Sequence, residues 1–106
     1  MTRALVNLPE TVPRGTVVEI RAMLQHPMET GHRRDAGGTL VPRDIVTRFE
    51  CRLGDALVFA ADLYPAMAAN PFIAFPLRAE RGGTLVLTWT GDRGFHHEER
   101  RTLAVA

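Results

Sequence analysis

The chain has 106 residues, of which 45% are hydrophobic and 24% are charged, and its formal net charge is +1. This length suits one domain and is too short for two ordinary ones. The balanced charge excludes the strongly basic surface of a nucleic-acid binder and offers no patch for an anionic membrane. All 13 positive residues are arginine, and we attribute this to coding bias rather than to anion binding.

Hydrophobic residues recur with a period of two along most of the chain, which predicts β-strands. Within residues 16–25, Val18 and Ile20 fall on one face, and Glu19 and Arg21 fall on the other. The pattern is that of half-buried antiparallel strands. The predicted strands span residues 3–8, 16–25, 45–53, 56–62, 73–80, 84–90 and 95–105.

Turn signals separate the strands at Gly54-Asp55, at Gly82-Gly83 and at residues 91–94. Seven short strands with such turns and no convincing helix predict an all-β fold. We expect an immunoglobulin-like antiparallel β-sandwich of about seven strands, formed as a single domain by residues 1–106. A small β-barrel is the alternative that the pattern leaves open.

Two connections, residues 26–44 and residues 63–72, are too long to be turns. If successive strands run antiparallel, both connections and the turn at 91–94 emerge at the same end of the sandwich. Sandwich domains often bind their partners with such an end. Tyr64, Met67 and Phe72 in the second connection have the bulky apolar side chains of interface cores.

The stretch HPMETGHRRD at 26–35 raises the possibility of a metal site. His26, Glu29, His32 and Asp35 are spaced by three, and imidazole with carboxylate can hold zinc or iron. That spacing brings the ligands to one face only in a helix, and the proline and the glycine inside the stretch oppose a helix. We therefore favour a polar loop over a metal site.

Cys51 is the single cysteine, so an internal disulfide is not possible. It alternates in phase with Phe49 and Leu53, which predicts a place in the core of the sandwich. A buried thiol has a raised pKa and little reactivity. The sequence also has no serine–histidine–aspartate motif, phosphate loop or Rossmann glycine pattern.

Four segments together resemble the SoxZ family, the small immunoglobulin-like subunits of the bacterial sulfur-oxidation carrier complex SoxYZ. They are HPMETG at 26–31, PRDIVTRFEC at 42–51, VFAADLYPAMAANPF at 58–72 and the late Trp89. The resemblance covers residues 16–106, and its departures lie in the turns at 54–55 and 91–94.

The resemblance implies a non-catalytic subunit of thiosulfate oxidation, with no cofactor and no metal. Its partner SoxY carries sulfur intermediates covalently on a cysteine in a glycine-flanked arm. SoxY forms a heterodimer with the SoxZ subunit, which stabilises it and adds docking surface. The complex is visited by a cytochrome that attaches thiosulfate, a hydrolase that releases sulfate and a sulfane dehydrogenase.

The expected location depends on this resemblance. The first residues contain no apolar run of seven or more, so we expect no signal peptide, which by itself would indicate the cytoplasm. Members of the family work in the periplasm. The resemblance therefore implies export as a passenger of SoxY, on the signal peptide of SoxY.

We expect the partner interface to lie at the end of the sandwich that carries the long connections. An alternative is pairing through a sheet face or a strand edge, which leaves the connections for the visiting enzymes. The residues expected in the interface are His26, Met28, Glu29, Arg33, Arg43, Tyr64, Pro65, Met67, Asn70 and Phe72.

Two other functions remain open from the residues alone. One is a free-standing β-sandwich binding module, which would be a stable monomer without a partner that carries the glycine-flanked cysteine. The other is a metal-binding enzyme that uses His26, Glu29 and His32.

Overall fold

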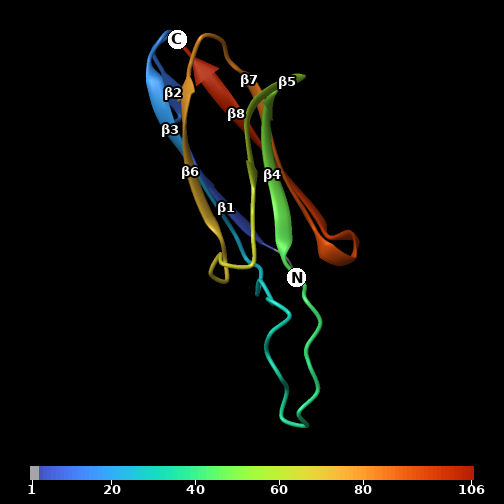
Figure 1. Ribbon diagram of the computed structural model, residues 1–106. Coiled ribbons are helices and arrows are strands. Elements are labelled where there is room, and N and C mark those ends of the chain that lie inside the picture. Colours follow the sequence, from blue (N-terminus) through green and yellow to red (C-terminus); the bar gives the residue numbers. More distant parts are fainter. Residues whose placement is uncertain (1–2) are drawn as a thin grey trace.

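Two packed β-sheets make up the protein in the computed structural model, which describes residues 3–106 (Figure 1). Eight strands lie in the described residues, together with one short 3₁₀ turn, η1. The elements are β1 (Ala4–Asn7), β2 (Thr11–Val12), β3 (Val17–Leu24), β4 (Val46–Leu53), β5 (Ala56–Asp62), β6 (Phe72–Arg78), β7 (Gly83–Gly91), η1 (Asp92–Gly94) and β8 (His96–Val105).

One sheet has three strands in the order β1-β3-β6, and the other has five in the order β2-β8-β7-β4-β5. All pairs are antiparallel except β2 with β8. The predicted immunoglobulin-like β-sandwich is thus confirmed, and each of the seven predicted strands is present. The sequence prediction missed β2, whose two residues are too few to show a period.

The core lies between the sheets and follows the period-two pattern of the strands. On β4, Phe49, Cys51 and Leu53 are buried and the residues between them are more exposed. The Phe49 ring lies 5.1 Å from the ring of Trp89 on β7 and 5.8 Å from that of Phe75 on β6, centroid to centroid. This aromatic cluster therefore joins the two sheets.

Three connections emerge at one end of the sandwich, at the bottom of Figure 1. They are residues 25–45, 63–71 and 92–95, and we call them the loop end. The predicted grouping of these connections at one end is confirmed, because β3, β5 and β7 all run toward it.

The first connection extends far beyond the sheets, as Figure 1 shows in cyan and green. The molecule is 58 Å long and only 22 by 20 Å across. Its radius of gyration is 16.1 Å, whereas a compact domain of this length has about 13 Å. The loop end thus carries a projecting hairpin, residues 29–44, which we call the arm. The described residues contain no helix with the length and apolarity to cross a membrane.

Candidate functional site

The loop end is held together by hydrogen bonds between its two long connections. The backbone N–H of His26 donates to Asn70 Oδ1 at 3.0 Å, and the Asn70 N–H donates to the His26 carbonyl at 2.7 Å. Asn70 has φ of 54°, a left-handed conformation that asparagine adopts more readily than most residues. These bonds fix where residues 63–71 lie relative to the arm.

His26 and Met28 form the buried base of the arm. His26 is 5% exposed and Met28 is 4% exposed. The Met28 N–H donates to His26 Nδ1 at 3.0 Å, and the His26 ring meets the Phe95 ring edge-on with centroids 4.8 Å apart. The Val46 N–H in turn lies 3.3 Å from Met28 Sδ. Both side chains therefore organise the loop end from inside.

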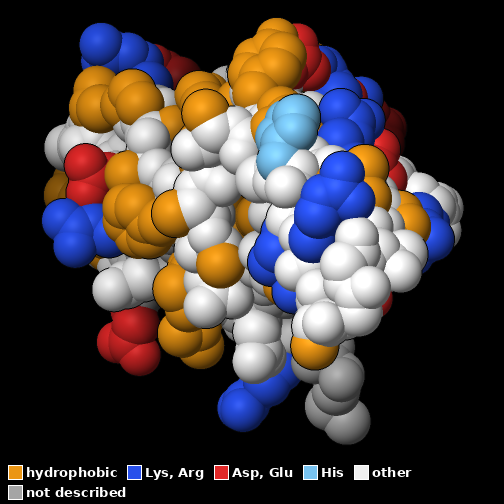
Figure 2. Space-filling view, turned by 60° about the horizontal axis from the view of Figure 1, so that its bottom comes forward, with side chains coloured by type: hydrophobic (Ala, Val, Ile, Leu, Met, Phe, Trp, Pro, Cys, Tyr) orange, Lys and Arg blue, Asp and Glu red, His pale blue; other side chains and the backbone are white. Residues whose placement is uncertain are grey.

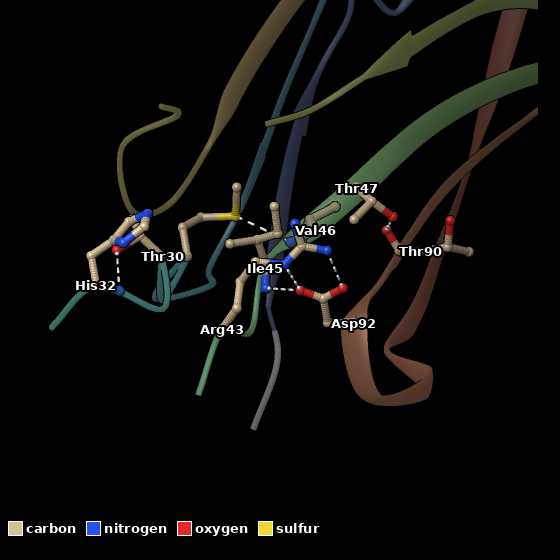
Figure 3. Close-up of polar contacts among 9 residues, drawn as sticks. Thr30, His32, Arg43, Ile45, Val46, Thr47, Thr90 and Asp92 are labelled. Carbon is tan, nitrogen blue, oxygen red and sulfur yellow. Dashed lines mark hydrogen bonds and ion pairs between the residues drawn. The ribbon is translucent and has the colours of Figure 1, made fainter. Parts of the chain in front are cut away.

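Arg43 and Asp92 join the arm to the turn between β7 and β8 (Figure 3). Arg43 Nε and its terminal NH2 group each donate to one oxygen of Asp92 at 2.9 Å, and the Ile45 N–H donates to the same carboxylate at 3.1 Å. The hydrogen bonds from Arg43 lower the pKa of the Asp92 carboxyl most, and the hydrogen bond from the Ile45 N–H lowers it further. A bidentate guanidinium–carboxylate pair has a fixed geometry, so it sets the angle at which the arm projects from the sandwich.

The arm itself is a hairpin made by residues 29–44. Isolated bridges pair Glu29 with Asp44 and Arg34 with Leu40. Arg33 donates to Glu29 at 2.7 Å, and this contact lowers the pKa of the Glu29 carboxyl. At the base, Gly31 has φ of 89°, and a Cβ there would lie 3.0 Å from Arg43 Cβ. Glycine is therefore required where the two branches of the arm come close.

The connection between β5 and β6 presents apolar and aromatic side chains, whereas the arm presents several charged ones. Tyr64 is 64% exposed, while Met67 packs against the core and its N–H donates to the Tyr64 carbonyl in a turn. Pro65 is half-buried. Phe72, which follows as the first residue of β6, is 55% exposed. In Figure 2, which looks toward this end, hydrophobic and arginine side chains share the surface.

The structure thus divides the predicted interface residues into two groups. His26 and Met28 lie inside, so their side chains do not contribute surface to the isolated chain. The others have exposed or half-buried side chains at the loop end, and they are Glu29, Arg33, Arg43, Tyr64, Pro65, Met67, Asn70 and Phe72.

The residues that suggested a metal site are not assembled into one. Nδ1 of His26 accepts a backbone hydrogen bond, Glu29 is ion-paired with Arg33, and His32 is exposed. Asp35 accepts hydrogen bonds from Gly37 and Thr39 in the turn at the tip of the arm. Across residues 3–106, no group of three or more histidine, cysteine or acidic side chains is placed to hold a metal ion.

Cys51 lies in the core, as predicted, with an exposed fraction of 0%. Burial raises the pKa of its thiol to about 11. At neutral pH the thiol is therefore protonated and shielded, whereas the thiolate is the reactive form.

The sequence pattern did not predict an apolar row that crosses the outer face of the three-stranded sheet. Leu5 on β1 and Met23 on β3 stand in register with each other, and Met23 is in register with Phe72. Leu5 is 63% exposed and Met23 is half-buried. The three side chains make an apolar row across the outer face of the three-stranded sheet, next to the loop end. Only the strand register reveals it, because each residue looks isolated in the sequence.

Fold and site together define an immunoglobulin-like β-sandwich with its single thiol buried and an elaborated loop end. A family model described as "Sulphur oxidation protein SoxZ" matches residues 6–102. The chain therefore belongs to the SoxZ family, and the resemblance found in the sequence is confirmed. The family and its fold place the chain among the subunits of sulfur oxidation.

Solved structures share this fold at low sequence identity. The sulfur carrier protein SoxY from Chlorobium limicola f thiosulfatophilum is 16% identical with a TM-score of 0.69, over 97% of this chain and 79% of SoxY. A superoxide reductase (neelaredoxin) from Ignicoccus hospitalis is 18% identical with a TM-score of 0.75, over 99% and 82% of the two chains. A putative superoxide reductase from Thermotoga maritima is 13% identical with a TM-score of 0.74, over 97% and 85%. Among curated proteins the chain has no significant match.

Proposed function

We propose that this chain is the non-catalytic partner of SoxY in a SoxYZ carrier complex for thiosulfate oxidation. Membership of the SoxZ family supports this, and so does the fold that the chain shares with a SoxY structure. In this proposal SoxY carries the sulfur intermediates on its glycine-flanked cysteine arm. The present chain stabilises SoxY and adds surface on which the enzymes dock.

The burial of Cys51 is the observation that carries the proposal. A carrier thiol has to reach the active sites of several enzymes, so it needs exposure and a flexible attachment. Cys51 has neither, because it is 0% exposed in the middle of β4 and its pKa is about 11. The sulfur therefore has to travel on another chain.

We further propose that the loop end meets the visiting enzymes. These are the cytochrome that attaches thiosulfate, the hydrolase that releases sulfate and the sulfane dehydrogenase. The arm supports this role because it projects from the sandwich and presents Arg33 and Arg34, both exposed. Charged side chains on a projecting hairpin are suited to brief, steered encounters.

We also propose that the chain works in the periplasm and is exported as a passenger of SoxY. Export in this way requires the complex to form first, in the reducing cytoplasm. A single buried cysteine is compatible with folding there, since no disulfide has to form. Fractionation of cells that lack the SoxY signal peptide tests this, and both chains should then remain in the cytoplasm.

Co-expression with affinity-tagged SoxY tests the proposed function. The chain should co-purify with SoxY in equal amounts, and the complex should support thiosulfate-dependent turnover by the sulfur-oxidation enzymes. The variant Cys51→Ala should bind SoxY and support turnover to the same extent as the wild type. A soluble chain that does not bind SoxY contradicts the proposal, as does an intact Cys51→Ala complex without turnover.

A further inference from the structure

The outer faces of the two sheets differ sharply in character. On the five-stranded sheet, Arg48 donates to Glu50 at 2.8 Å and to Asp62 at 2.9 Å, and Arg52 lies 3.2 Å from Glu50. On β8 of the same sheet, Glu98 and Arg100 form a further exposed ion pair. Networks of this kind suit a surface in permanent contact with water.

The outer face of the three-stranded sheet is mainly apolar at the loop end. Its row of Leu5, Met23 and Phe72 continues along β6 with Ala74 and Pro76, whose side chains are exposed. We call these five residues the sheet-face patch. A surface hollow of about 380 Å³ adjoins it and is lined in part by Leu5, Met23 and Phe72. Contiguous exposed apolar surface of this kind marks interaction sites in soluble proteins.

Charge around the sheet-face patch is mainly positive. The hollows on this face are lined by Arg3, Arg21 and Arg101, and the one carboxylate in those linings is Glu19. Glu19 is already paired with Arg21 at 2.6 Å, and Arg101 is paired with Glu99 at 2.9 Å. These two pairs neutralise Arg21 and Arg101, whereas Arg3 lines the hollow beside Leu5 and Met23 and has no ion-pair partner within residues 3–106. Arg3 therefore favours an Asp or Glu side chain on the molecule that covers the patch.

A second copy of this chain fits the patch poorly. A two-fold dimer would place the same face against itself and bring the Arg3 side chains of both copies, which lack an acidic partner within residues 3–106, into one interface. Like charges across an interface oppose association. The surface is better matched by a different chain with an apolar sheet face and an acidic border.

The size of the face shows how far the contact extends. Strands of four, eight and seven residues, spaced about 4.8 Å apart, cover about 300 Å². A stable interface buries about 800 Å² on each partner. The contact thus has to continue onto neighbouring surface, and Asn70, which is exposed and lines a hollow together with Leu5 and Met23, lies where it would continue.

We propose that the outer face of β1-β3-β6, centred on Leu5, Met23 and Phe72, binds the SoxY subunit through an apolar SoxY surface bordered by carboxylates. This inference rests on the proposed function, because it takes SoxY as the partner. The SoxY structure shares the sandwich fold, so the two chains can pack sheet against sheet. The arm then stays free for the visiting enzymes.

Two matched leucine substitutions test the proposal. Leu5 on β1 is 63% exposed within the sheet-face patch, and Leu57 on β5 is 48% exposed outside it. Leu5→Asp should weaken SoxY binding at least tenfold in a calorimetric titration, while Leu57→Asp should bind like the wild type. Arg21→Glu should also weaken binding, with a loss that shrinks as salt screens the charges.

The outcomes separate this proposal from the proposed function. A wild-type chain that does not bind SoxY refutes the proposed function and this surface with it. Binding of SoxY that Leu5→Asp and Arg21→Glu leave unchanged refutes the surface alone. A wild-type homodimer in light scattering that Leu5→Asp dissociates, with SoxY binding unaffected, assigns the face to a second copy and also overturns the proposal. Thermal melts show whether each variant is folded. If Leu5→Asp does not fold, the effect of Arg21→Glu on SoxY binding tests the surface in its place.

Discussion

Iodoacetamide should modify Cys51 of the native chain far more slowly than it modifies an accessible cysteine. The thiolate is the form that attacks, and the pKa of Cys51 is raised from 9.0 to about 11 by burial. Each pKa unit is a tenfold change in thiolate at a pH below both values. The thiolate fraction is therefore about 100-fold lower than for an unperturbed cysteine.

Shielding slows the reaction further. The sulfur is 0% exposed in the aromatic core, so the reagent reaches it only when the sandwich opens. With a stability of about 5 kcal/mol, the open form is populated at roughly 2 in 10,000. The native chain should accordingly stay unlabelled for hours under conditions that label the urea-unfolded chain within minutes.

Mass spectrometry of timed samples measures both rates, with the unfolded chain as the control for reagent and pH. The same burial predicts that stability falls between pH 9 and pH 11. The unfolded thiol ionises first there, and the loss reaches about 3 kcal/mol from two pKa units. Cys51→Ala should not show this part of the pH dependence. Labelling of the native chain at the rate of the unfolded chain would refute the buried placement.

Three further predictions concern the core and the loop end. Phe49→Ala should cost about 3–5 kcal/mol in urea unfolding, since its ring joins the two sheets, and a loss under about 1 kcal/mol would be inconsistent with that role. Gly91→Ala should destabilise by about 1–3 kcal/mol, because a Cβ there would lie 2.9 Å from Val46 Cα; a Tm equal to the wild type would argue against this close approach. Asp92→Asn should lower the free energy of unfolding at pH 7, and should lower it by a smaller amount at pH 3, which is below the unfolded pKa of the carboxyl. The lowered pKa of Asp92 means that its pairing with Arg43 stabilises above the unfolded value of about 3.8, and is lost as pH falls through the folded value; an equal loss at both pH values would speak against the pairing.

Much of the fold could be predicted from the sequence, because period-two alternation reports directly which residues face the core. It placed Phe49 and Cys51 inside, and turn residues such as Gly54 marked the ends of the strands. The pairing of Thr11–Val12 with β8 could not be predicted. That strand has two residues, and its parallel pairing depends on where the end of the chain lies in space.

The candidate site was harder to predict for two physical reasons. His26 and Met28 lie in a polar, proline-containing stretch that reads as surface, yet backbone hydrogen bonds and the left-handed φ of Met28 turn both side chains inward. The row of Leu5, Met23 and Phe72 depends on the register of three strands that are far apart in the sequence. No local pattern encodes either arrangement.

The proposal that SoxY and not this chain carries the sulfur is tested by finding where sulfur is bound during turnover. The complex of this chain with SoxY is incubated with thiosulfate and the thiosulfate-attaching cytochrome, and the intact mass of each chain is then measured. We expect a sulfur adduct on SoxY and an unmodified mass for this chain, since Cys51 is shielded in the core. An adduct on Cys51 that forms at the rate of turnover would show that this chain itself carries sulfur and would overturn the proposed function.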